Sequence, residues 1–161
     1  MHKRWRSLIG TMRNIVIILL TSFSISGCNS GVGTLGGFDS IKFETDKKTL
    51  LTGIDSLYKQ YPEYVIPDKW KDFDSWSERG YDFLEGQVLY FSSSPEEMYY
   101  ITILAGDETR IAIRAVNTGS HRWLLEEDFS LTEKGRIERR FDLEIISKLE
   151  KLTKSKSVRG D

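Results

Sequence analysis

The apolar positions between residues 46 and 62 recur with the period of an α-helix. Six of them form one stripe, namely Leu50, Leu51, Ile54, Leu57, Tyr58 and Tyr61. Asp46 precedes the stripe as a helix cap, and Pro62 ends it because proline has no backbone N–H to donate. Gly53 within the stripe indicates close packing against another element. The pattern predicts a helix from Asp46 to Pro62, and residues 41–45 alternate as a short strand before it.

From residue 87 the period changes to two, which is typical of half-buried strands. Strands are predicted at residues 87–91, 97–105, 110–116 and 121–125, and the short turns between them make antiparallel hairpins. In residues 110–116 the alternation places Ile111, Ile113 and Ala115 inward, with Arg110 and Arg114 outward.

A turn signal with Gly135 in the left-handed position suggests a small hairpin that joins residues 129–131 to 136–138. From Arg139 the helical period returns, with apolar positions at Phe141, Ile145, Leu149 and Leu152. This spacing predicts a helix over residues 139–153. The fold class expected is therefore α+β, an antiparallel sheet of four to five short strands covered by an N-terminal and a C-terminal helix.

The first 27 residues have the layout of a secretory signal. Residues 1–14 are basic, residues 15–25 are apolar, and small residues follow. At about 1.5 Å per residue the apolar run forms about 16 Å of helix, whereas a hydrocarbon core is about 30 Å thick. The segment is thus predicted to direct export and to be removed, and not to span a membrane.

Residues 25–28 read Ile-Ser-Gly-Cys, and here the chain resembles bacterial lipoproteins. Their lipobox has an aliphatic residue, two small residues and a cysteine, and Cys28 is the one cysteine of this chain. The resemblance implies cleavage between Gly27 and Cys28, diacylglycerol on the Cys28 thiol, and a further acyl chain such as palmitate on the new amino group. The alternative is a secreted protein with an incidental free thiol.

The lipoprotein resemblance also predicts a location and a domain plan. Under the enterobacterial sorting rule an aspartate after the cysteine retains a lipoprotein in the inner membrane, so Asn29 implies the outer membrane of the cell envelope. Two or three acyl chains hold a protein stably on a membrane. The plan comprises a signal peptide at 1–27, the lipidated cysteine and a Gly/Ser-rich tether at 28–40, the α+β domain at 41–153 and a frayed basic tail at 154–161.

Charge and composition narrow the class of ligand. The whole chain sums to -1, but residues 28–161 carry 19 basic and 24 acidic side chains and sum to -5. That balance lacks the basic excess of a nucleic-acid-binding protein, so no nucleic-acid partner is expected. Gly31, Gly33 and Gly36 match a dinucleotide-binding pattern, but the stretch follows Cys28 directly and not a strand, so we interpret it as a linker.

The inventory of catalytic side chains is small. After export the chain retains one histidine, His121, and contains no HExxH, CxxC or GxSxG motif. No catalytic residue, metal site or cofactor is therefore predicted. Acidic side chains are abundant, at Asp72, Asp74, Glu96, Glu97, Glu126, Glu127 and Asp128. Their spacing selects no pair for glycoside hydrolysis, which needs two carboxylates about 5–10 Å apart.

Aromatic residues form the one suggestive cluster, because 12 of the 19 lie between Tyr58 and Tyr100. Trp70, Phe73 and Trp76 have helix-like spacing and alternate with charged residues. Two interpretations follow. The three rings either fill the space between helix and sheet, or form an exposed surface that binds a sugar or a protein.

These observations predict a membrane-anchored envelope lipoprotein with a non-enzymatic domain that binds a protein or glycan partner. One alternative is an immunity or inhibitor protein whose acidic surface meets a basic toxin. Another is a small hydrolase of glycan or cell-wall substrates. The hydrolase alternative requires two carboxylates that converge in one pocket, at least one of them with a raised pKa.

Overall fold

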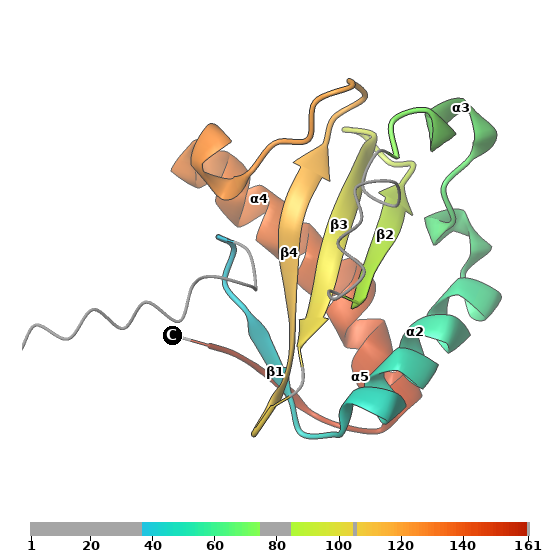
Figure 1. The fold of residues 1–161 in the computed structure, drawn as a ribbon, viewed down its shortest axis with the longest axis vertical. Coiled ribbons are helices and arrows are strands. Elements are labelled where there is room, and N and C mark those ends of the chain that lie inside the picture. The colour runs from blue at the N-terminus through green and yellow to red at the C-terminus, as the bar shows by residue number, and fades with distance from the viewer. Residues whose placement is uncertain (1–36, 75–84, 105, 161) are drawn as a thin grey trace, which may run out of the picture. The chain divides into compact units, whose positions relative to one another are not determined.

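The computed structural model describes residues 37–74, 85–104 and 106–160, in which five strands form one antiparallel sheet of order β2-β3-β4-β1-β5 (Figure 1). The strands are β1 (Ile41–Phe43), β2 (Glu85–Phe91), β3 (Glu97–Leu104), β4 (Thr109–Asn117) and β5 (Ser157–Arg159). The helical elements are α2 (Lys47–Gln60), η1 (Pro62–Tyr64), α3 (Asp68–Lys71), η2 (Glu126–Asp128), α4 (Leu131–Phe141), the π-helical turn η3 (Asp142–Ile146) and α5 (Ser147–Thr153). The predicted α+β class is confirmed.

Helix α2 follows its predicted limits. The Asp46 carboxylate accepts a hydrogen bond from the Thr49 backbone N–H at 2.9 Å, and η1 begins at Pro62. A Cβ atom at Gly53 would lie 2.6 Å from the Thr153 side chain, so glycine permits the close approach of α2 to α5. The prediction of close packing at this glycine is confirmed.

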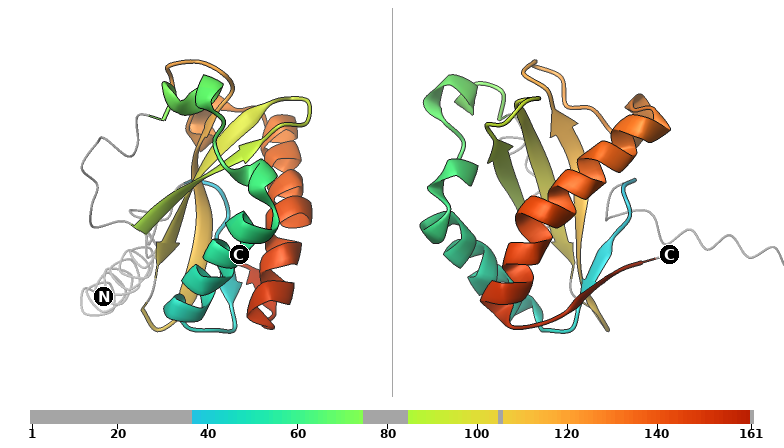
Figure 2. Two further views of the ribbon diagram at one scale, coloured as in Figure 1. Left: turned by 90° about the vertical axis from the view of Figure 1, so that its right-hand side faces the viewer. Right: turned by 180° about the vertical axis from the view of Figure 1, so that it is seen from behind.

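Helices α4 and α5 run on from one another through η3 and form the longest element of the domain (Figure 2). The side chains that it buries against the sheet recur every four residues, at Ile137, Phe141, Ile145 and Leu149. A helix of 3.6 residues per turn drifts away from such a spacing, and the wider π-turn restores the phase. The predicted helix over 139–153 is confirmed, but it begins eight residues earlier, at Leu131.

The expected hairpin at residues 129–138 is wrong because Ser130 begins a helix. The Ser130 hydroxyl accepts from the Glu133 backbone N–H, and the Glu133 carboxylate accepts from the Ser130 backbone N–H. This reciprocal capping box satisfies two backbone groups at the helix start. Gly135 consequently lies inside α4 and not in a left-handed turn.

Helices α2, α4 and α5 cover one face of the sheet (Figure 2). The main core lies between these two layers and includes Leu50, Ile54, Tyr99, Ile103 and Leu149. On the opposite face a second cluster contains Trp70, Tyr90, Met98, Tyr100, Ala115 and Trp123. Two separate apolar clusters therefore bury both faces of the central strands.

A β-bulge in β4 corrects the predicted alternation. Ile113 pairs with Ile101, but Ala115 pairs with the adjacent Tyr100, so Arg114 has no partner on β3. The extra residue moves Ala115 to the face of the second cluster, whereas Ile111 and Ile113 remain in the main core. The expectation that these three side chains share one face is wrong for Ala115.

Two expectations about the C-terminal half are also corrected. Residues 121–125 do not form a full strand, because Leu124 makes an isolated bridge to Val116. The predicted frayed tail at 154–161 is wrong for residues 154–160, since β5 pairs with β1 and Arg159 binds the carboxylates of Glu138 and Asp142. Backbone pairing and ion pairs hold this segment against the domain.

Residues 1–36 lie outside the described part of the chain, and with them the predicted signal peptide and most of the predicted tether. Within the described residues no helix combines the length and the hydropathy required to cross a membrane.

Candidate functional site

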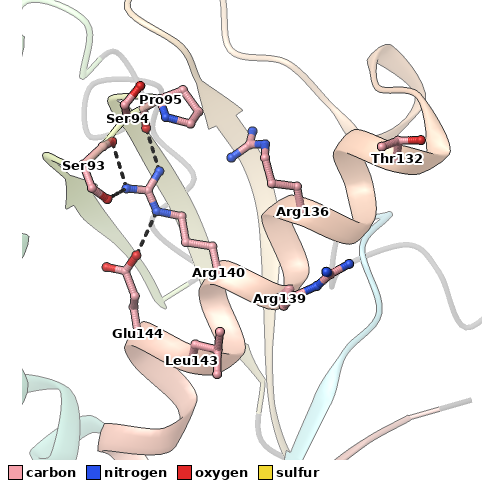
Figure 3. A pocket seen from close by; sticks show the side chains of 9 residues that line it. All are labelled: Ser93, Ser94, Pro95, Thr132, Arg136, Arg139, Arg140, Leu143 and Glu144. Atoms are coloured by element: carbon pink, nitrogen blue, oxygen red, sulfur yellow. Dashed lines mark hydrogen bonds and ion pairs between the residues drawn. The ribbon is translucent and has the colours of Figure 1, made fainter.

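A cleft of about 550 Å³ opens between the β2–β3 turn and the outer side of α4 and η3 (Figure 3). We call it the arginine cleft, and it is lined by Ser93, Ser94, Pro95, Thr132, Arg136, Arg139, Arg140, Leu143 and Glu144. Three guanidinium groups from one helix and hydroxyls from both sides supply its polar atoms. Such a set of donors is suited to an anion, because guanidinium binds carboxylate or phosphate with two parallel hydrogen bonds.

The floor of the cleft is built on a buried carboxylate. The Glu97 side chain, at the start of β3, is 1% exposed and accepts two hydrogen bonds from Arg136, at 2.9 and 2.5 Å. It accepts further bonds from Arg140 at 3.1 Å and from the Tyr99 hydroxyl at 2.9 Å. The hydrogen bond to Glu97 raises the pKa of Arg136 above its already high ordinary value. Glu97 is thus a fully paired ion that fixes two arginines to the sheet.

Arg140 connects the helix to the turn. Its guanidinium lies 4.6 Å from the centroid of the Phe91 ring and donates to the Pro95 carbonyl at 2.6 Å and the Ser93 carbonyl at 3.1 Å. It also donates to the Ser93 hydroxyl and, at 3.0 Å, to Glu144. All three nitrogens of Arg140 are engaged, and its side chain is 9% exposed. Arg140 is therefore a structural residue of the cleft.

Arg139 has the opposite environment. Its side chain is exposed, and within the described residues it makes no hydrogen bond or ion pair. Figure 3 shows it directed away from the β2–β3 turn, toward which Arg140 points. Thr132, Arg136, Arg139 and Leu143 recur at spacings of four, three and four residues and share one side of the helix. We call this stripe the rim of the arginine cleft.

Glu144 lines the cleft beside the rim but is already engaged. It accepts from Arg140, and its carboxylate and backbone carbonyl lie 3.4 and 3.3 Å from the Tyr64 hydroxyl. Burial, together with the nearby Glu144 charge, raises the pKa of Tyr64 to about 12, so the hydroxyl remains protonated. Glu144 is the one carboxylate among the described lining residues. The cleft thus lacks the second, unpaired acid that the hydrolase alternative requires.

The structure does not place the three residues of the predicted aromatic surface in one exposed patch. Trp70 is 6% exposed, and its ring centroid lies 5.6 Å from those of Phe73 and Tyr90. It also packs over Gly119, whose φ of 88° favours glycine and where a Cβ atom would lie 3.4 Å from the indole. Trp70 is thus a packing residue, Phe73 is half-buried against it, and Trp76 lies outside the described residues.

The other candidate side chains remain apart from the cleft. His121 is exposed and packs edge-on against Phe73, with ring centroids 5.1 Å apart. Glu126 pairs with Lys134, and Asp128 pairs with Arg122. In the described part of the chain no three His, Cys, Asp or Glu residues converge as a metal site. Gly27 and Cys28 lie outside the described residues.

No local sequence pattern marks the arginine cleft as a site. Its parts come from residues 93–97 and 132–144, which only the packing of α4 against the sheet brings together. The sequence nevertheless contains a clue to the buried Glu97. It lies two and four residues before Tyr99 and Ile101 on the same strand, so its side chain points to the same, core-facing side. Comparisons with protein-family models, curated proteins and solved structures found no match.

Proposed function

We propose that this protein is a lipid-anchored component of the bacterial cell envelope whose α+β domain binds an anionic partner in the arginine cleft. The observation that supports binding is the rim, where the exposed Arg139 stands beside the partly exposed Arg136 in a cleft of about 550 Å³. A guanidinium without a protein partner is available for a charge-assisted hydrogen bond to a ligand.

The same chemistry favours binding over catalysis. Guanidinium groups keep their protons at neutral pH and do not serve as general acids or bases. The carboxylates nearest the cleft, Glu97 and Glu144, both accept hydrogen bonds from Arg140. The arrangement offers fixed positive charge and hydroxyl groups, which is what recognition of an anion requires.

The anchor is supported by the lipobox of residues 25–28 and the apolar run before it. Gly37, where the described chain begins, is nine residues from Cys28, and at about 3.5 Å per residue this stretch spans at most about 30 Å. A chain lipidated at Cys28 thus keeps its domain within a tether length of the membrane. The proposed partner is accordingly one that is present at the membrane surface.

Lipidation is tested by labelling cells that express the full chain with an alkyne-bearing palmitate. The wild type takes up the label and fractionates with membranes, whereas Cys28→Ala loses both properties. Asn29→Asp is the matched control: it keeps the label, and in a bacterium with the enterobacterial sorting rule it moves to the inner membrane. Continued membrane association of unlabelled Cys28→Ala contradicts the anchor.

A further inference from the structure

We infer that the occupant of the arginine cleft is an acidic segment of a protein partner, with an apolar side chain next to its carboxylates. This inference rests on the proposed binding function and specifies its ligand.

The rim offers two guanidinium groups of different availability. Arg139 is exposed and unpaired within the described residues. Arg136 donates two hydrogen bonds to Glu97, and its side chain is 37% exposed. Thr132, one turn before Arg136, adds an exposed hydroxyl. Arg136 is thus held in place by Glu97, whereas Arg139 is the rim guanidinium that has no partner within the described residues and can bind a carboxylate.

Apolar side chains lie beside these charges. Leu143, on the same side of the helix as Arg139, is 68% exposed, and Leu131 at the start of α4 is 85% exposed. Leu143 lines the cleft from the helix, and Pro95 lines it from the β2–β3 turn. Arginine is enriched at protein interfaces, and an apolar contact beside it excludes water and so strengthens the neighbouring ionic hydrogen bonds.

The charges around the cleft disfavour a membrane surface as its occupant. Glu144 lines the cleft and Glu133 lies on the same helix as the rim arginines, whereas Glu138 is paired with Arg159. Each basic residue near an anionic bilayer adds attraction and each acid offsets a similar amount, so the local attraction largely cancels. Residues 28–161 also sum to -5. One or two carboxylates of a peptide, in contrast, reach the guanidiniums without approaching all of these acids.

The test is site-specific photo-crosslinking from the full chain in its own bacterium, with p-benzoylphenylalanine replacing the exposed Leu143. The expected product joins position 143 to a protein segment that contains Asp or Glu. In the same chain Arg139→Glu lowers the yield about fivefold through charge repulsion. Lys151→Glu, an equal charge change at an exposed position on α5, leaves the yield unchanged. Replacement of the partner's acid by Lys restores crosslinking to the Arg139→Glu chain.

The outcomes separate this inference from the proposed function. A crosslink to a segment without acids, a product with lipid, or a yield insensitive to Arg139→Glu overturns the acidic segment but leaves the cleft as a binding site. A yield at position 143 no higher than that from the same probe at the exposed Lys59 of α2 overturns both. Circular dichroism of each variant verifies that the domain remains folded.

Discussion

The floor and the rim of the arginine cleft use the same side chain in opposite ways. Arg140 is 9% exposed and is bonded to the turn, to Glu97 and to Glu144, whereas its neighbour Arg139 is exposed and unpaired within the described residues. One helical residue step, a rotation of about 100°, separates the two environments. The difference shows that neighbouring arginines of α4 can differ completely in role, since one is bonded into the fold and the other is presented to solvent.

Removing the buried charge of the floor should cause the largest loss of folding stability. Glu97→Ala leaves Arg136 and Arg140 without their shared carboxylate, and we expect the free energy of unfolding to fall by about 3 kcal/mol. Urea denaturation of the full chain in detergent, followed by circular dichroism, measures the change. A loss below about 1 kcal/mol contradicts a structural role for the floor.

Separate truncation of the two neighbouring arginines distinguishes the structural role of Arg140 in the floor from the exposed position of Arg139 in the rim. Arg140→Ala should lower the free energy of unfolding by about 2 kcal/mol, because the Pro95 and Ser93 carbonyls lose a charged donor. Arg139→Ala should change it by less than about 0.5 kcal/mol, as is usual at exposed positions. Equal effects in the same denaturation experiment contradict the division between floor and rim.

The start of α4 supports floor and rim together. Ser130→Ala removes the hydroxyl that accepts from the Glu133 backbone N–H, and we expect a loss of about 1 kcal/mol. Thr132→Ala, two residues later and exposed, is the control and should be nearly neutral. If both variants unfold at the wild-type urea concentration, the capping box does not stabilise the helix.

The smallest change in stability that we expect comes from Glu133 and depends on pH. Hydrogen bonds from the hydroxyl and backbone N–H of Ser130 lower the pKa of Glu133 below its ordinary value. A carboxylate with a lowered pKa stabilises the fold above its ordinary pKa and loses that contribution as the pH falls toward the folded-state value. Wild type should therefore exceed Glu133→Gln in stability at pH 6, and the margin should shrink as the pH falls through about 4. If the difference in stability between wild type and Glu133→Gln does not change with pH, the Glu133 carboxylate does not stabilise the start of α4.

Local signals in the sequence identified the elements whose stabilising contacts are close in sequence. Helix α2 was predictable because its cap, its apolar stripe and Pro62 all lie within residues 46–62. At α4 the Ser130-x-x-Glu133 spacing is a comparable local signal for a helix, whereas the glycine-containing turn pattern predicts a hairpin. The helix there forms because the capping box and the burial of Ile137 outweigh the cost of Gly135.

Features that depend on distant contacts were not predictable in the same way. The pairing of β5 with β1 joins residues more than 100 positions apart, and no pattern in residues 154–161 indicates it. The bulge at Arg114 changes the faces of β4 without any glycine or proline to mark it. The cleft likewise arises from tertiary packing. The alternation of β3 nevertheless directs the Glu97 carboxylate into the core, and a buried carboxylate needs a basic partner.

We propose that the rim, and not the floor, binds carboxylates. Binding at the rim is tested most directly by titrating ¹⁵N-labelled full chain in detergent with the acetylated peptide Glu-Leu-Glu and recording the arginine Nε–Hε resonances. We expect the Arg139 signal to shift saturably while the Arg140 signal stays in place, and Gln-Leu-Gln to have no effect. Equal shifts of both arginines, or no shift at Arg139 with either peptide, would contradict it.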